Sequence, residues 1–158
     1  MTDEQKQLDE RTTARGLLNY AKEYYSGYEL LQNQEPSIVK YFAVKYYLLC
    51  HSLELVMKAW LKKQGATYIE LKRLGHDLEK IMVLLHDSYG ILFDAESQAM
   101  IKIVNQYYSQ KEFEYALKGA KSVPVITELA SIVHLLISKA RFDIIFDGDP
   151  SKLRASNE

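Results

Sequence analysis

Residues 46–61 of this chain of 158 residues read YYLLCHSLELVMKAWL. If this stretch is helical, its apolar side chains fall on nearly every face of the helix. The same character continues on both sides, so we expect a helix from about residue 36 to 64, with Pro36 in its first turn and Gly65 at its end. A helix that is apolar on nearly all sides lies at the centre of a bundle or is covered by a partner. The stretch therefore predicts an all-helical protein built around this segment.

Other segments with helical spacing of apolar residues surround this one. One runs over about 12–34, a second begins after Asp77 and runs over about 78–88, a third follows Asp94, and the last is opened by Ser122 and Pro124. No strand-like alternation persists, and no linker divides the chain. We predict an all-α, up-and-down bundle of four to five helices that forms a single domain over residues 1–158, with frayed ends at about 1–11 and 147–158.

The bulk composition excludes several classes of protein. Hydrophobic residues make up 47% and charged residues 26%, which is typical of a globular domain. The formal net charge of -1 gives no overall positive field for nucleic acid, although a locally basic face stays open. The longest uncharged apolar run, Leu129–Ser138, is far shorter than the roughly 20 residues of a membrane span. Cys50 is the only cysteine, so we expect no intrachain disulfide, which fits a cytoplasmic protein.

A group of polar residues interrupts the apolar central helix. His51, Glu54 and Lys58 share one helical stripe, and Glu54 precedes Lys58 by four residues, the favourable order for an ion pair. His76 lies just before the next helix, where it would reach Glu54, and Asp77 would cap that helix. Two interpretations stay open for this candidate polar patch. The commoner one is a satisfied structural network, and the other is a functional pocket.

A second candidate surface combines tyrosines with basic residues. Tyrosine rings stack on bases and lysines hold phosphates, but such rings more often belong to a core or a dimer interface. Basic groups near a helix end are also favoured by the helix dipole. The candidate ligand-binding residues are Lys72, Arg73, Tyr107, Tyr108, Lys111 and Tyr115, with Lys118 close by in the sequence.

Metal and cofactor chemistry have no sequence signature. Neither an HExxH nor a paired Glu-x-x-His pattern occurs, so we expect no metal site. The glycines at 65 and 75 are isolated, so there is no phosphate-cradling loop and we expect no cofactor. Cys50 and His51 are adjacent on a helix and point about 100° apart, which argues against a nucleophile and its base.

The segment 46–61, followed by Gly75-His76-Asp77-Leu78, resembles the HEPN domain family. The similarity extends over about residues 12–146. It implies an up-and-down bundle of four to five helices that commonly forms a homodimer. Members of the family include metal-independent ribonucleases, toxin partners of small nucleotidyltransferases, and non-catalytic modules that bind RNA or nucleotides.

The chain departs from the ribonuclease members in one respect. Those members carry an Arg-x4-6-His motif near the final helix, and no arginine here precedes a histidine at that spacing. Lys45 lies six residues before His51, but on the central helix and with lysine in place of arginine. We therefore expect a non-catalytic binding module for RNA, a nucleotide or a protein partner, acting as a homodimer because one bundle would not cover the apolar central helix. The alternatives are a divergent metal-independent ribonuclease and a toxin–antitoxin component paired with a nucleotidyltransferase.

Overall fold

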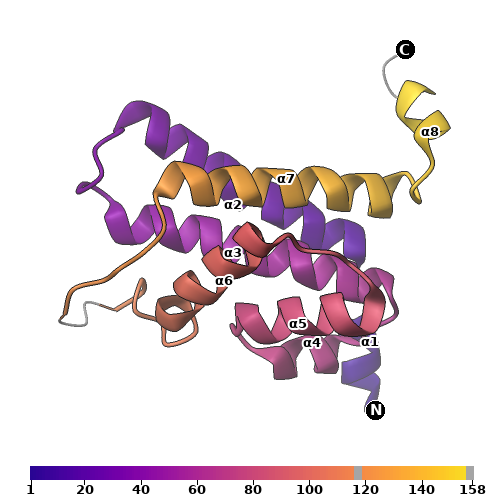
Figure 1. The fold of residues 1–158 in the computed structure, drawn as a ribbon. Coiled ribbons are helices and arrows are strands. Elements are labelled where there is room, and N and C mark those ends of the chain that lie inside the picture. The colour runs from indigo at the N-terminus through magenta and orange to yellow at the C-terminus, as the bar shows by residue number, and fades with distance from the viewer. Residues whose placement is uncertain (116–118, 156–158) are drawn as a thin grey trace.

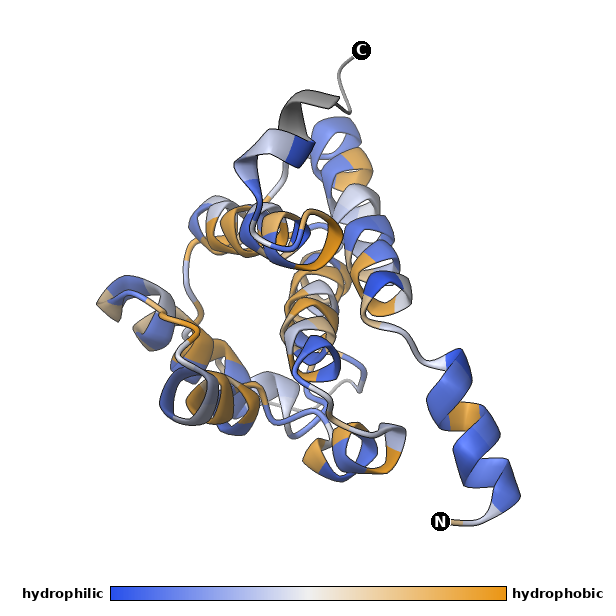
Figure 2. Ribbon diagram, turned by 90° about the vertical axis from the view of Figure 1, so that its right-hand side faces the viewer, coloured by the Kyte–Doolittle hydropathy of each residue, from blue (hydrophilic) through white to orange (hydrophobic). Residues whose placement is uncertain are grey.

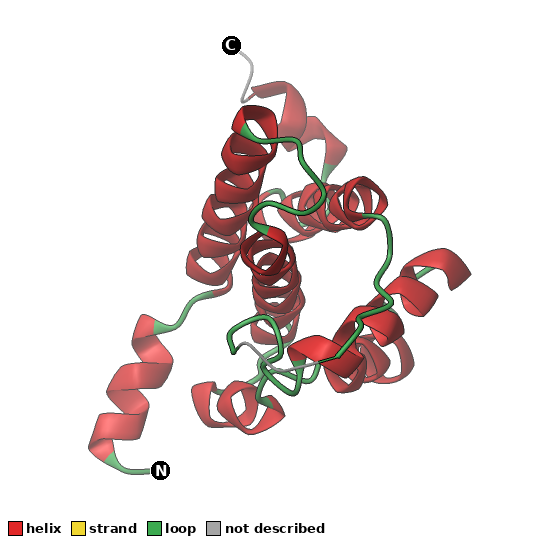
Figure 3. Cartoon of the chain, turned by 90° about the vertical axis from the view of Figure 1, so that its left-hand side faces the viewer, coloured by secondary structure: helices red, strands yellow, loops and turns green. Residues whose placement is uncertain are grey.

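The structure is a computed structural model that describes residues 1–115 and 119–155. Over these residues the chain forms helices and no strands, so the all-α prediction is confirmed (Figures 1 and 3). The helices are α1 (Asp3–Arg11), α2 (Ala14–Gln34), α3 (Phe42–Lys63), α4 (Tyr68–Leu74), α5 (Leu78–Tyr89), α6 (Ala95–Tyr108), α7 (Ile126–Ile145) and α8 (Pro150–Ala155).

Helix α3 lies at the centre of the bundle, as the sequence predicted. It packs against α2, α7 and α5, and more lightly against α4 and α6. Leu49, Leu53 and Met57 are fully buried along it, and so is Trp60, whose Nε1 donates a hydrogen bond to Asp143 Oδ2 on α7 at 2.9 Å. Figure 2 shows the other helices arranged around it, with α1 set apart and almost wholly hydrophilic. The chain's own helices thus cover most of the apolar surface of α3, and Val44, near its start, is 48% exposed.

The long helices lie side by side and run in both directions (Figure 1). The Ser52 hydroxyl of α3 donates to the carbonyl of Ala21 on α2 at 2.7 Å, and Gly27, later on α2, faces Leu48, earlier on α3, so these two helices are antiparallel. Helix α7 runs in the same direction as α3, because its start lies near Tyr46 and its end near Trp60. The backbone N–H at the start of α5 bonds Asn105 near the end of α6, so these two are antiparallel. The helices thus form a bundle in which both antiparallel and parallel neighbours occur.

Helix α3 begins at Phe42, so the prediction that Pro36 opens it is wrong. Residues 35–41 form an irregular connection, and Tyr41 adopts a left-handed conformation with φ 57° that ends it. The Ser37 hydroxyl oxygen accepts the N–H groups of Val39 and Lys40, each at 3.2 Å. Hydrogen bonds of this kind between a serine side chain and the backbone compete with helix formation. They explain why the helix does not begin at Pro36.

Helix α7 begins at Ile126, and the expectation that Ser122 and Pro124 open it is also wrong. The Ser122 N–H donates to the Tyr107 hydroxyl at 2.8 Å, and the Tyr46 hydroxyl donates to the Pro124 carbonyl. Both contacts hold residues 122–124 as a loop against α3 and α6.

The two ends of the chain contain helices where fraying was expected. Thr2 and Gln5 form a capping box at the start of α1, whose residues are all at least partly exposed. Asp9 Oδ1 accepts hydrogen bonds from Lys62 Nζ at 2.7 Å and from the Tyr68 N–H at 2.6 Å, which ties α1 to α3 and α4. Near the other end, α8 follows Asp149. None of the described helices combines the length and apolar content needed to cross a membrane.

Candidate functional site

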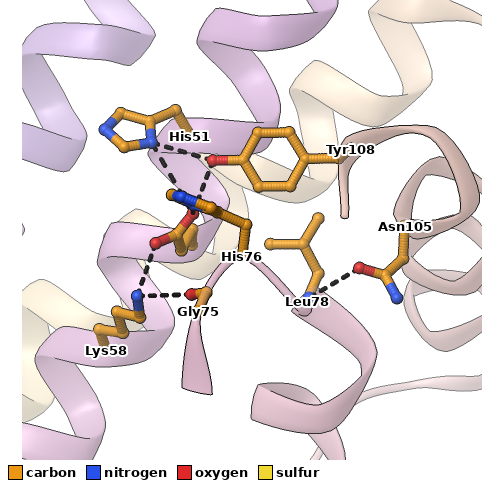
Figure 4. A network of polar contacts seen from close by, with 8 residues as sticks. His51, Lys58, Gly75, His76, Leu78, Asn105 and Tyr108 are labelled. Atoms are coloured by element: carbon orange, nitrogen blue, oxygen red, sulfur yellow. Dashed lines mark hydrogen bonds and ion pairs between the residues drawn. The ribbon is translucent and has the colours of Figure 1, made fainter. Parts of the chain in front are cut away.

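Glu54 is the centre of a buried polar network that joins α3, the turn before α5 and the end of α6 (Figure 4). Its side chain is 3% exposed. Oε1 accepts a hydrogen bond from Lys58 Nζ at 2.6 Å. Oε2 accepts from the Tyr108 hydroxyl at 2.6 Å and from His76 Nδ1 at 2.9 Å. The contacts of Glu54 with Lys58 and His76 were both expected from the sequence.

His51 joins this network from one helical turn before Glu54. Its Nδ1 lies 2.9 Å from the Tyr108 hydroxyl and 3.8 Å from Glu54 Oε2. The rings of Tyr24 and Tyr47 pack on the imidazole, the first edge-on at 4.4 Å between centroids and the second stacked at 5.5 Å. The imidazole is therefore held on its faces by aromatic rings and at Nδ1 by the network.

The hydrogen bonds of the network fix which atoms of the two histidines carry hydrogen. The Tyr108 hydroxyl gives its one hydrogen to Glu54, so His51 Nδ1 must donate to the Tyr108 oxygen. His76 Nδ1 also donates, because a carboxylate only accepts. The Nε2 atoms of both rings are the ones left outside the network. The side chains of His76 and His51 are 41% and 18% exposed, so solvent reaches both residues.

The electrostatics of the network favour an ionised Glu54. Burial alone would raise the pKa of the Glu54 carboxyl, but His51, Lys58 and the Tyr108 hydroxyl together hold that pKa well below its usual value. Burial and the neighbouring carboxylate raise the pKa of Tyr108, which stays a neutral donor. Lys58 Nζ makes a second hydrogen bond, to the Gly75 carbonyl at 2.8 Å.

Gly75 allows the turn that places His76 over Glu54. Its φ of 60° and ψ of -136° form a conformation that side chains with a Cβ rarely adopt. This conformation ends α4, turns the Gly75 carbonyl towards Lys58 and leads directly into the histidine.

Asp77 belongs to a neighbouring cluster. Its Oδ1 accepts from the Lys80 N–H at the start of α5 and from Asn105 Nδ2, both at 3.0 Å. Asn105 Oδ1 in turn accepts from the Leu78 N–H at 2.8 Å. The predicted N-cap is confirmed. The structure brings together four residues of the candidate polar patch, and places the fifth in a contact that fastens α5 to α6.

The second candidate surface is divided by the fold. Tyr108 is fully buried in the Glu54 network, so it is not free to stack on a base. The Tyr107 ring packs against Phe113 with centroids 6.1 Å apart, and its hydroxyl holds Ser122. Lys111 and Tyr115 are exposed after α6, whereas Lys72 and Arg73 are exposed in the last turn of α4. Lys118 lies outside the described residues.

Two parts of the network were missed by sequence reasoning. Tyr108 was a candidate ligand-binding residue, with a core or dimer-interface position as the commoner alternative, and Asn105 was not singled out. Asn105 could have been noticed, because it is a polar residue next to Val104 in an apolar part of α6. Glu54 is likewise a polar residue in an apolar part of α3, and such residues need hydrogen-bond partners when they are buried. The role of Tyr108 depends on a contact across more than fifty positions of sequence, which no local pattern reveals.

The chemistry available here is that of imidazole. Cys50 is fully buried, and burial raises the pKa of its thiol, so it is a core residue. In the part of the chain that the structure describes, no three His, Cys, Asp or Glu side chains gather as a metal would need. With the hydrogen on Nδ1, each neutral ring presents Nε2 as an acceptor that can take up a proton, and only the protonated ring can donate from Nε2 to an anion.

Comparison of the chain with protein-family models, curated proteins and solved structures returns no match. The HEPN resemblance therefore stays a prediction that rests on the residues quoted above.

Proposed function

We propose that this chain is a non-catalytic, HEPN-like module that binds RNA or a nucleotide through the surface above the Glu54 network. The observation that carries the proposal is the position of His76. A buried carboxylate holds its Nδ1, while the ring is 41% exposed. Lys72 and Arg73 are exposed in the helical turn that leads to it and supply positive charge for phosphate groups.

Binding is favoured over cleavage because the cation of the network, Lys58, is already hydrogen-bonded within it. Metal-independent cleavage of RNA needs a proton-transferring group and a fixed cation beside the scissile phosphate. Lys58 is the cation nearest the carboxylate, and its ammonium group donates to Glu54 and to the Gly75 carbonyl. The Arg-x4-6-His motif of the ribonuclease members is also missing from the sequence.

A divergent ribonuclease is the second candidate, and one observation favours it. Glu54 and Tyr108 orient two imidazoles in the same site, and a pair of histidines can serve as general base and general acid. In that case His51 and His76 would be the proton-transferring groups, and the cation would come from α4.

Titration of a labelled structured RNA in EDTA, followed by fluorescence polarisation, tests the proposal. We expect saturable binding without cleavage. The Lys72→Ala/Arg73→Ala variant should weaken it and reduce the slope of log K against log salt by roughly 1.5–2. Lys102→Ala, which removes an exposed cation from α6, is the matched control and should bind as the wild type does.

The other outcomes of this titration are equally informative. Cleavage in EDTA would support the ribonuclease. If the Lys72→Ala/Arg73→Ala variant binds RNA as the wild type does, the surface that includes α4 is not the binding site. If the protein neither binds nor cleaves RNA or nucleotides, the remaining expectation from the resemblance is a protein partner of the nucleotidyltransferase type, detected by co-purification. Light scattering of the purified chain tests the homodimer that the resemblance also implies.

A further inference from the structure

A cavity of about 440 Å³ lies at the other end of α3, beside the 35–41 connection and the first residue of α7. Apolar side chains form most of its wall, among them Ile38, Val39, Phe42 and Ile126. The volume falls within the range of small-molecule sites, which are mostly apolar with a few placed polar groups. Neither the histidines nor Glu54 line this cavity, so its function is independent of the proposed RNA site.

Lys45 places a positive charge at this cavity, and within residues 1–115 and 119–155 no carboxylate forms an ion pair with it. The residue is 2% exposed, and its Nζ donates to the carbonyls of Glu35 and Ser37, the latter at 3.0 Å. Both partners are neutral oxygens. The Glu35 carboxylate pairs with Lys40 instead, at 3.1 Å. An ammonium group has three donors, so Lys45 retains one, and no described residue of the cavity wall is acidic.

Ser37 adds a second donor at the cavity. Its hydroxyl oxygen already accepts the N–H groups of Val39 and Lys40, so its hydrogen remains to be donated. Tyr46, the other polar residue of the wall, donates its hydroxyl to the Pro124 carbonyl. Lys45 and Ser37 thus each retain a side-chain donor at the cavity, and these donors match an anionic group of a ligand.

The rim of the cavity exposes apolar side chains to water. Ile38 and Val39 are 79% and 80% exposed, and covering them would be favourable. Next to them, Tyr41 holds the left-handed conformation described above, which is costly for a residue with a side chain and occurs often at ligand clamps.

We propose that this cavity binds a small apolar molecule that carries one carboxylate. The apolar part lies against Ile38, Phe42 and Ile126, and the carboxylate accepts hydrogen bonds from Lys45 Nζ and the Ser37 hydroxyl. The carboxylate supplies the anion that Lys45 lacks, and the apolar chain covers the rim.

Isothermal titration of the purified protein with decanoate and with decanol, both below the concentrations at which they aggregate, tests the proposal. The two probes share the apolar chain and differ in charge. We expect saturable binding of decanoate at one site, about tenfold or more tighter than that of decanol. Absence of saturable decanoate binding, or equal affinity for the two probes, would overturn the proposal.

Two variants locate the site. Ile38→Asp puts a negative charge on the exposed rim and should weaken decanoate binding at least tenfold, whereas Leu92→Asp, at an exposed position far along the chain, should leave it unchanged. Lys45→Met should reduce the affinity for decanoate to that for decanol. If Lys45→Met does not fold, Ile38→Asp still decides, and wild-type affinity in that variant would refute the assignment.

Discussion

His76 Nδ1 donates a hydrogen bond to Glu54 Oε2 across 2.9 Å, and this contact joins the turn before α5 to the middle of α3. Because Glu54 is buried and also binds Lys58 and Tyr108, the position of the histidine is set by groups on two helices, α3 and α6. The stability of the bundle and the presentation of His76 therefore depend on the same carboxylate.

Replacing Glu54 by Gln should lower the stability of the fold. The substitution keeps the shape of the side chain but leaves the buried Lys58 ammonium without its counter-charge, which costs about 3–5 kcal/mol in comparable buried pairs. Urea denaturation of the wild type and of Glu54→Gln measures the difference. Glu23→Gln, on the exposed face of α2, is the control and should stay within about 0.5 kcal/mol of the wild type.

The contribution of Glu54 to the free energy of unfolding should be lost at acidic pH. The folded-state pKa of Glu54 lies well below its ordinary value of 4.5, so the unfolded chain binds the proton first as the pH falls. The stabilisation is complete well above pH 4.5 and declines below it, until the folded carboxyl is itself protonated. The difference in unfolding free energy between the wild type and Glu54→Gln should shrink accordingly. A difference that stays constant through the acid range would contradict the ionised network.

Removing the Tyr108 hydroxyl should destabilise the protein without opening the core. Tyr108→Phe keeps the buried ring but takes a donor from Glu54 and an acceptor from His51, at a cost of about 1–3 kcal/mol. Thermal or urea unfolding measures the loss. Tyr20→Phe, whose ring is exposed on α2, should unfold like the wild type, and equal stability of the two variants would argue against the network.

The candidate site shows how far local pattern reaches. His51, Glu54 and Lys58 could be grouped because a single helix carries them, and His76 could be added because it lies just before the next helix. Tyr108 could not be assigned in the same way, since its place depends on how α6 packs on α3. The apolar residues around Tyr108 in the sequence would be the same whether its hydroxyl contacted water or a buried carboxylate.

The fold shows the same limit at the ends of its helices. The apolar periodicity located the long helices, but it did not place the starts of α3 and α7. The left-handed Tyr41 precedes α3, and the contact of Tyr46 with the distant Pro124 carbonyl holds the loop before α7. Neither α1 nor α4 was predicted, although the sequence carries a local signal for both. Each follows a threonine with Gln or Glu three positions later, at Thr2 and Thr67, which is the pattern of a capping box.

Asp9 should control the attachment of α1. Its carboxylate contacts Lys62 Nζ and the Tyr68 N–H, and these contacts, with Lys62 the larger cause, lower its pKa. Asp9→Ala should speed amide hydrogen exchange over residues 3–11 and leave exchange in α3 unchanged, because α1 has no buried residue. Asp3→Ala, at the exposed start of the same helix, is the control for a general loss of helix stability.

The most direct test of the central claim is binding of a labelled structured RNA in EDTA by the wild type, His76→Ala and His86→Ala, with cleavage followed by gel in the same samples. His86 is a partly exposed histidine on α5, and its Nδ1 lies 3.1 Å from Asp87 Oδ1. It therefore controls for the loss of a surface imidazole. We predict that the wild type binds without cleaving, that His76→Ala binds about tenfold more weakly while remaining folded, and that His86→Ala is unchanged. Cleavage that His76→Ala abolishes, or wild-type binding by His76→Ala, would contradict the account.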